Sequence, residues 1–281
     1  MTPLLVVPMQ RAWGWQSTFY VFGSVGVIWC AVWYWRYRDR PAEKKGITQT
    51  ELDEIGAGSG SNVHTPVPWR RVLRRSAFWR LLLMYHTYNW CAYFYLSWLH
   101  TYLQKGRGFT PDQMKLWSML PFALGACAIL VGGQLSDRLV ARYGLKVGRR
   151  AVGVTGLALS AVCLTTTAFT QNPSVAAIFL ALAYATSDAC VPVSWAIALD
   201  VGGKNAGAIS GAMNMAGQVG SFMSSIAFGH LIELFGSYDL ALLPLAAMVG
   251  ISSILFWSID PTEQLVPGEE DDVRVARPQI A

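Results

Sequence analysis

Polar side chains inside otherwise apolar segments are the residues of this sequence best placed to do chemistry. One group lies between residues 78 and 101 at spacings that share a helix face: His86, Asn89 and Tyr93. A second pair, Asn214 and Gln218, is one helical turn apart. An unpaired amide in lipid is costly, so these groups are expected to face protein or water. Each is a candidate to bind a polar substrate in a cavity, or else to form a hydrogen bond between helices.

The run at residues 174–199 carries both a proline and a carboxylate. Pro192 removes a backbone hydrogen bond and is expected to bend the helix around a cavity, next to Ser194 and Trp195. Asp188 lies within the apolar run, where an ionisable residue is a functional candidate by default, so we consider it for ion coupling. The alternative is that Asp188 completes a network of hydrogen bonds.

Residues 132–150 form a charged stretch between two apolar runs. Asp137 and Arg138 follow the glycines that end the first run, and Arg149 directly precedes the second. This pattern predicts a tight, charged turn between two helices. Further along, Asp200 and Lys204 form either a second ion pair or solvated loop charges.

Long apolar segments must position these side chains. Of the 281 residues, 53% are hydrophobic and 14% are charged, with a mean hydropathy of +0.34; a soluble domain has roughly 25% charged residues. The apolar residues gather in runs of about 20, the length of a membrane-spanning helix. The sequence therefore predicts an all-α polytopic membrane protein with spans at 15–37, 78–101, 114–134, 151–170, 174–199, 206–229 and 239–258.

The cations are distributed unevenly between the predicted loops. Of the 22 Lys and Arg residues, 18 lie on one alternating set of loops. Such asymmetry marks cytoplasmic loops, which places residues 38–77, residues 138–150 and the C-terminus inside. The net charge of +5 is thus explained by membrane topology and contact with lipid, and no nucleic-acid partner is expected.

Local motifs predict how several segments begin and end. Thr48 and Glu51 have the spacing of a capping box, which predicts a short acidic helix through Ile55 in the loop at 38–77. Thr110 is the predicted N-cap of the third span. Gly207 and Gly211 form a GxxxG motif, which permits close helix approach. Residues 260–281, with the acidic run at 269–272, are predicted to be a disordered cytoplasmic tail.

Neither an enzymatic centre nor a cofactor or metal site is expected. The sequence contains no HExxH motif, and no dyad of Ser with Lys or His stands out. Its five cysteines all fall in apolar runs without CxxC spacing, which favours helix packing over disulfides or metal ligation.

Several motifs resemble those of one transporter family. Residues 133–138 (GQLSDR) with 148–150 (GRR) resemble the G-x-L-x-D-R…G-R-R/K loop of the major facilitator superfamily. Residues 14–20 (GWQSTFY), 38–41 (RDRP) and 98–103 (WLHTYL) are similar to segments of its anion:cation symporter branch, which includes sialin-like, hexuronate and galactonate transporters. His100 departs from the branch, which usually has proline there.

The resemblance implies a fold. Residues 15–37 would be transmembrane helix 6, residues 78–259 the C-terminal six-helix half, and residues 1–10 the remnant of helix 5. The count of seven spans would then not indicate a seven-span receptor. The chain is expected to be truncated, without the N-terminal half that supplies this branch with a substrate-binding Arg and a coupling carboxylate.

The resemblance also implies a function and site residues. The expected substrate is a small organic anion, such as a sugar acid or carboxylate, moved with H⁺ or Na⁺ across the plasma (inner) membrane by alternating access. Asn214 matches a cavity-lining Asn of helix 11, and Ser194 with Trp195 matches a hydroxyl–Trp pair of helix 10. Residues expected in the cytoplasmic gate are Asp137, Arg138 and Arg149. The alternative is a non-transporting structural or regulatory half-carrier.

Overall fold

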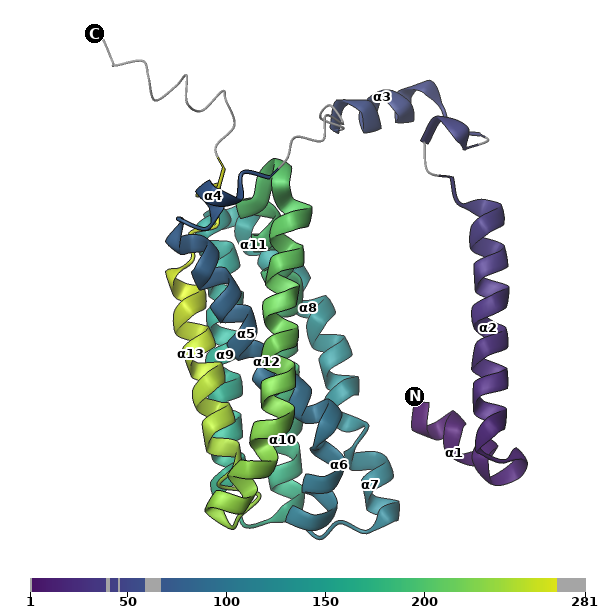
Figure 1. The fold of residues 1–281 in the computed structure, drawn as a ribbon, viewed down its shortest axis with the longest axis vertical. Coiled ribbons are helices and arrows are strands. Elements are labelled where there is room, and N and C mark those ends of the chain that lie inside the picture. Colours follow the sequence, from purple (N-terminus) through teal and green to yellow (C-terminus); the bar gives the residue numbers. More distant parts are fainter. Residues whose placement is uncertain (1, 39–40, 45, 59–66, 267–281) are drawn as a thin grey trace. The chain divides into compact units, whose positions relative to one another are not determined.

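The structure is a computed structural model that describes residues 2–38, 41–44, 46–58 and 67–266. All regular elements in these ranges are helical, which confirms the all-α class. The chain divides into two compact units, residues 1–66 and residues 67–281, each described by itself below. Within the described ranges a helix occupies every one of the seven predicted spans (Figure 1).

The first unit contains the helix at the first predicted span. Helix α1 (Thr2–Trp13) packs on α2 (Trp15–Arg36), and the turn between them depends on Gly14, whose φ is 80°. No residue of α2 is buried. A 22-residue apolar helix without protein cover fits a lipid environment or a contact with a further protein surface.

The segment predicted as a cytoplasmic loop contains two short helices, η1 (Pro41–Glu43) and α3 (Gln49–Gly58). The capping box at α3 is confirmed, because Thr48 N donates to Glu51 Oε2 at 2.9 Å and Glu51 N donates to Thr48 Oγ1 at 3.3 Å. These bonds hold the pKa of the Glu51 carboxyl below its usual range. The helix runs past Ile55 to Gly58, further than predicted.

The second unit is a bundle of long helices (Figure 1). It is built, in chain order, from α4 (Trp69–Val72), α5 (Ser76–Ser97), α6 (Leu99–Thr101), η2 (Tyr102–Gly106), α7 (Pro111–Trp117), α8 (Leu120–Tyr143), α9 (Leu145–Phe169), α10 (Pro173–Asp188), α11 (Val191–Gly202), η3 (Gly203–Asn205), α12 (Ala206–Phe235) and α13 (Leu242–Ser258). Helix α5 packs on α12 and α13, and α9 packs on α8, α10 and α13.

Length and hydropathy mark four stretches of the described chain as able to cross a membrane: Trp15–Arg36, Pro111–Tyr143, Leu145–Phe169 and Pro173–Phe235. The last stretch contains three helices, α10 to α12. Helix α13 is apolar but has 17 residues. Helix α5 is not among these stretches, in keeping with its polar side chains.

The charged turn is shorter than predicted. Helix α8 continues through Asp137 and Arg138 to Tyr143, and α9 begins at Leu145, so one residue separates them. That residue is Gly144, whose φ of 84° belongs to the left-handed region that favours glycine. The charged motif is therefore helical, and each of its side chains has a fixed direction.

The run at residues 174–199 is broken, as the proline predicts. Helix α10 ends at Asp188 and α11 begins at Val191. Pro192 has no N–H to donate to the carbonyl of Asp188, four residues earlier. Gly132 of α8 packs directly against the carbonyl of Ala189, so the neighbouring helix touches the backbone at the break.

Two further expectations are wrong in part. A Cβ on Gly207 or Gly211 would meet nothing within 4 Å in the described structure, so the GxxxG motif makes no close helix contact there. Helix α12 instead approaches α5 closely at Gly217 and Gly220. Residues 260–266 of the predicted disordered tail are packed, because Leu265 is buried and its N–H donates to Val201 O at 3.0 Å. The acidic run at 269–272 lies outside the described residues.

Candidate functional site

The polar residues of α5 share one face, as their spacing predicts, and the structure places this face against α12. The Tyr93 hydroxyl donates to Gln218 Oε1 at 3.0 Å, and one turn further along Ser97 Oγ lies 3.2 Å from Ser225 Oγ. Tyr93 is half-buried and Gln218 is exposed. Tyr93 uses only the amide oxygen of Gln218, and no described residue accepts from the amide nitrogen, which can therefore donate to a ligand.

Asn214 lies one turn before Gln218 on α12 and is half-buried. No protein group among the described residues forms a hydrogen bond with its side chain. An interhelical hydrogen bond was one of the two explanations of this residue, and the described structure shows none. Its amide is therefore available to a ligand, to water or to protein outside the described ranges.

Trp195 of α11 reaches the same region through an aromatic contact. Its ring packs edge-on against Tyr85 of α5, with centroids 6.5 Å apart, and the residue is 37% exposed. Tyr85 in turn accepts, through its carbonyl, a 2.7 Å hydrogen bond from Asn89 Nδ2. Trp195 thus meets α5 at Tyr85, which also packs on α12 at Gly217, the residue before Gln218.

Three other candidates have partners inside the bundle. Asn89 is buried, and besides its bond to Tyr85 it accepts from Ser221 Oγ at 3.5 Å. His86 Nδ1 lies 3.1 Å from Ala216 O, and Trp90 Nε1 donates to His86 Nε2 at 3.3 Å.

Both ring nitrogens of His86 are therefore occupied. Ser194 is buried, and its hydroxyl donates to Cys190 O of its own helix at 2.9 Å. Asn89 and His86 thus join α5 to α12, whereas Ser194 bonds to the backbone one turn earlier in the chain.

Asp188 ends α10 and is 6% exposed. The Tyr88 hydroxyl of α5 donates to its Oδ1 at 3.1 Å, and the Tyr184 side chain, one turn earlier on α10, is a second partner. The carboxyl packs on the backbone of α8 at Gly125. No cation among the described residues forms an ion pair with Asp188.

Arg149 joins three helices at one end of the bundle. Its guanidinium contacts Asp137 of α8 at 2.8 Å and Asp200 of α11 at 3.4 Å, and donates to Ser136 Oγ at 3.0 Å. Asp200 therefore pairs with Arg149 rather than with Lys204. Arg138 is exposed on α8, and no described residue of this cluster forms a hydrogen bond or ion pair with it.

The same end of the bundle holds further cations. Arg80 and Arg150 donate to the carbonyls of Ser258 and Ile259, where α13 ends, at 2.9 and 2.8 Å. Lys146 forms an ion pair with Asp260. These bonds satisfy carbonyl groups that have no partner within the helix, and cations are favoured at a helix C-terminus.

A second cluster, which the sequence did not reveal, lies around Arg107 after η2. The guanidinium contacts Asp239 at 2.9 Å and donates to the carbonyls of Thr167 and Thr170 at 2.6 Å each, and its Nε donates to the Tyr102 hydroxyl at 2.8 Å. Arg107 was visible in the sequence as one of four cations on the minor set of loops, but nothing there indicated its partners.

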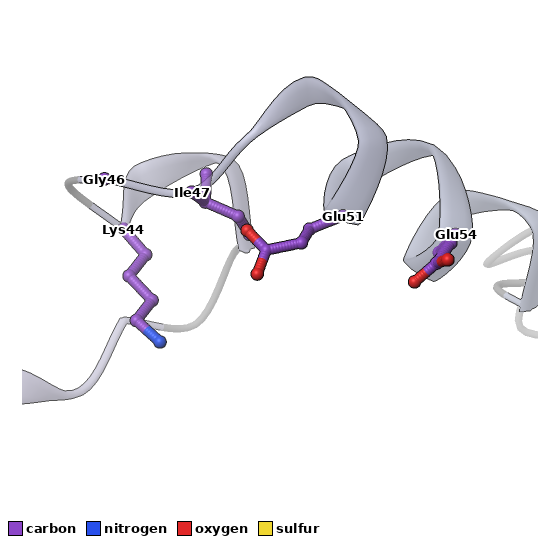
Figure 2. A pocket seen from close by; sticks show the side chains of 5 residues that line it. All are labelled: Lys44, Gly46, Ile47, Glu51 and Glu54. Carbon is purple, nitrogen blue, oxygen red and sulfur yellow. The ribbon is translucent and has the colours of Figure 1, made fainter.

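The first unit carries an open cleft that is not suited to an anion. It has a volume of about 330 Å³ and is lined by Lys44, Gly46, Ile47, Glu51 and Glu54. Figure 2 shows Lys44 at one side of the turn and both glutamates on α3. Two carboxylates repel an anionic ligand, and Glu51 already caps α3.

Comparison with known proteins places the chain in a family. The sequence profile described as the Major Facilitator Superfamily matches residues 9–225. The chain belongs to this superfamily. The match covers α2, the α8–α9 junction with Asp137 and Arg149, and most of α12, which confirms the resemblance found from the motifs.

Individual relatives carry names that refer to anions or acids. The chain is 35% identical to the "Probable sulfoacetate transporter SauU" of Cupriavidus necator over 265 residues, which cover 93% of the chain and 61% of that protein. It is 25% identical to the "D-galactonate transporter" of Escherichia coli over 270 residues, 91% and 61% of the two chains. For the chloroplastic "Ascorbate transporter" of Arabidopsis thaliana the identity is 26% over 270 residues, 95% and 49%.

The chain therefore spans between about half and three fifths of the length of these relatives. As a member of the superfamily with long apolar helices, it is an integral membrane protein.

Proposed function

We propose that this chain forms the C-terminal half of the substrate pathway of a secondary transporter for a small organic anion. The observation that carries the proposal is the availability of the Asn214 amide on an apolar helix, one turn from Gln218. Unpaired amides are costly in lipid, so a group of this kind needs a polar partner. A substrate oxygen in an aqueous cavity supplies one.

The site favours a carboxylate, sulfonate or similar oxyanion. Tyr93 donates to the Gln218 amide oxygen, which leaves the amide nitrogen for a ligand, and Asn214 adds a second amide donor. The exposed Trp195 ring offers a flat apolar wall for the substrate's carbon skeleton. Asn89 and His86 then serve the site by fixing α5 against α12 rather than by contacting substrate directly, and Ser194 is satisfied by the backbone one turn earlier.

Positive charge for the anion has to come from outside this group. No Lys or Arg lies between Arg80 and Lys105, or between Arg150 and Lys204, so the middles of α5, α9, α10 and α11 have none. We propose that a part of the complete protein beyond these helices, or a co-transported H⁺ or Na⁺, supplies the balancing charge. The names of the relatives support an anionic substrate.

Alternating access requires a gate whose contacts break and form. We propose that Arg149, held by Asp137 and Asp200, belongs to the cytoplasmic gate, and that Arg138 acts from the exposed face of α8. Since α11 carries both Trp195 and Asp200, movement of this helix links the site to the gate. We propose the plasma (inner) membrane as location, with the C-terminus in the cytoplasm, on the basis of the cation distribution.

The test is transport by the complete protein in proteoliposomes. The panel comprises sulfoacetate, galactonate, ascorbate and a neutral sugar, each with a pH gradient, a Na⁺ gradient or neither. Saturable uptake of an organic anion, stimulated by one gradient and absent for the neutral sugar, is the expected result. Absence of uptake for every anion, with the protein correctly inserted, would instead favour a structural or regulatory half-carrier.

A further inference from the structure

The break between α10 and α11 holds a carboxyl group with unusual surroundings. Asp188 is the last residue of α10, and the two residues after it, Ala189 and Cys190, form the turn that precedes α11. Because Pro192 cannot donate a hydrogen bond to the Asp188 carbonyl, the helix is weakest next to this carboxyl. Broken helices of this kind often border ion or substrate sites in transporters.

Among the described residues, every titratable side chain that interacts with the Asp188 carboxyl is neutral at physiological pH. The titratable side chains that interact with Asp188 come from α5, from α10 and from the turn before α11: Tyr85, Tyr88, Cys91, Tyr184 and Cys190. Tyrosine and cysteine carry no charge near pH 7 in their ordinary state. From α8 the backbone itself covers the group, since a Cβ on Gly125 would lie 2.8 Å from Asp188 Oδ2.

A carboxylate in these surroundings has no counter-ion among the described residues. Burying an unpaired charge costs several kcal/mol, and a buried acid avoids that cost by binding a proton. Two tyrosine hydroxyls beside the group can donate to the ionised form, so both protonation states have partners. A metal cation such as Na⁺ would need several oxygen acceptors, whereas Tyr88 presents a donor to the carboxyl.

Aromatic contacts connect Asp188 with the substrate site. Tyr88, which donates to Asp188, packs on Tyr85 with centroids 5.5 Å apart, and Tyr85 packs on Trp195. Protonation removes the charge that the hydroxyls point at and turns one carboxyl oxygen into a donor, so a tyrosine hydroxyl has to rotate. The same α11 carries Asp200, the partner of Arg149, near its C-terminal end.

We propose that Asp188 is a proton-binding site of this half of the transporter, and that its protonation changes the position of α11 relative to α10. The carboxylate takes one proton from the aqueous side and releases it to the other side within a transport cycle. This inference rests on the proposed function for its role in transport, but proton binding itself does not depend on that role.

Proton binding is tested on this chain in detergent with dicyclohexylcarbodiimide, which adds to protonated carboxyl groups in apolar surroundings. Mass spectrometry of peptides measures the adduct between pH 5 and 9. At pH 7 we expect at least about 10-fold more labelling of Asp188 than of Asp200, which is paired with Arg149. A tenfold ratio corresponds to protonation midpoints of the two groups that lie one pH unit apart. Tyr88→Phe removes a donor to the ionised form and should extend the labelling of Asp188 to higher pH.

No labelling of Asp188 at any pH would overturn the proposal. Protection of Asp188 by Na⁺ at constant pH would also overturn it, since it would identify a metal cation as the bound ion. These results do not depend on transport activity.

The coupling role is tested in the complete protein. Asp188→Asn keeps the shape of the side chain but binds no proton. We expect it to retain exchange of labelled for unlabelled anion and to lose, by at least about 10-fold, accumulation driven by a pH gradient. Undiminished accumulation in Asp188→Asn would refute the coupling role. Loss of exchange in the unsubstituted protein would instead refute the proposed function and leave the labelling result to stand by itself.

Discussion

Replacing Arg107 by Ala should destabilise the second unit more than any other single charge deletion discussed above. The Arg107 side chain is 6% exposed and contacts four groups: Asp239, the carbonyls of Thr167 and Thr170, and the Tyr102 hydroxyl. It joins η2 to the end of α9 and to the connection between α12 and α13. Its loss leaves a carboxylate and two carbonyls without their charged donor.

The magnitude follows from burial. Breaking a buried ion pair by removing one partner costs about 3–5 kcal/mol. Since the Asp239 side chain remains 29% exposed and can recruit water, the lower end of that range, about 3 kcal/mol, is expected. For a unit of this size this corresponds to a fall of roughly 6–12 °C in Tm. Arg107→Lys should recover only part of the loss, because an ammonium cannot reproduce the planar fork of donors.

The assay is thermal unfolding of the chain in detergent, followed by tryptophan fluorescence. Lys115→Ala is the matched control, because Lys115 forms an exposed ion pair with Asp112 across one helical turn, and such pairs contribute about 0.5 kcal/mol or less. Equal Tm values for Arg107→Ala and Lys115→Ala would refute the view that the Arg107 cluster holds the helix ends together.

Three further predictions concern the other end of the bundle and the break. Gly132→Ala should lower the free energy of unfolding by about 2 kcal/mol, because the new methyl overlaps the carbonyl of Ala189. The control Gly133→Ala should change it by less than about 0.5 kcal/mol, because its new methyl would lie 3.6 Å from the Pro192 side chain. Equal effects of the two substitutions in chemical unfolding would contradict the close approach at Gly132. Arg149→Ala should reduce the maximal rate of transport at least about 10-fold, more than Arg138→Ala does, and the reverse order would contradict the gate assignment. A hydrogen bond from Lys146 lowers the pKa of Asp260 to about 2, so this bond stabilises the fold above pH 4 and its contribution should disappear as the pH falls from 4 to 2. The contribution is below about 1 kcal/mol, because Lys146 is half-exposed. In Asp260→Asn that part of the pH profile of unfolding should be absent.

Local patterns predicted the elements well. Apolar runs located the helices, and the capping box predicted at Thr48 is present because its partner lies three residues away. The predicted N-cap Thr110 is also present, but it caps the short helix α7 that precedes α8. The polar spacing on α5 predicted that these residues share one face, since residues at i, i+3 and i+7 lie on one side of any helix; that this face meets α12 came from the structure. These features depend on a few neighbouring residues, so the sequence contains them directly.

Contacts between distant segments were not predictable in the same way. Arg107 and Asp239 lie far apart in the sequence, with helices α7 to α12 between them, and only the fold brings them together. The GxxxG motif showed which glycines are regularly spaced, but not which face of α12 meets α5; that face carries Gly217 and Gly220.

The same limit applies to the candidate site. The sequence identified Asn89, His86 and Asn214 as equally polar residues in apolar surroundings, and their roles differ through their neighbours. Asn89 and His86 find partners across the α5–α12 contact, whereas the Asn214 amide has no protein partner among the described residues. The distinction between a packing residue and a residue available to a ligand thus required the relative placement of two helices.

The most direct test of the proposed pathway compares two adjacent residues of α12 in the complete protein. Asn214→Ala removes the amide that the site presents, whereas Met215→Ala shortens a 65% exposed apolar side chain on the same helix. Initial rates of anion uptake into proteoliposomes, normalised to inserted protein, should fall at least about 10-fold for Asn214→Ala and stay near the unsubstituted rate for Met215→Ala. Equal rates for Asn214→Ala and the unsubstituted protein would contradict the account.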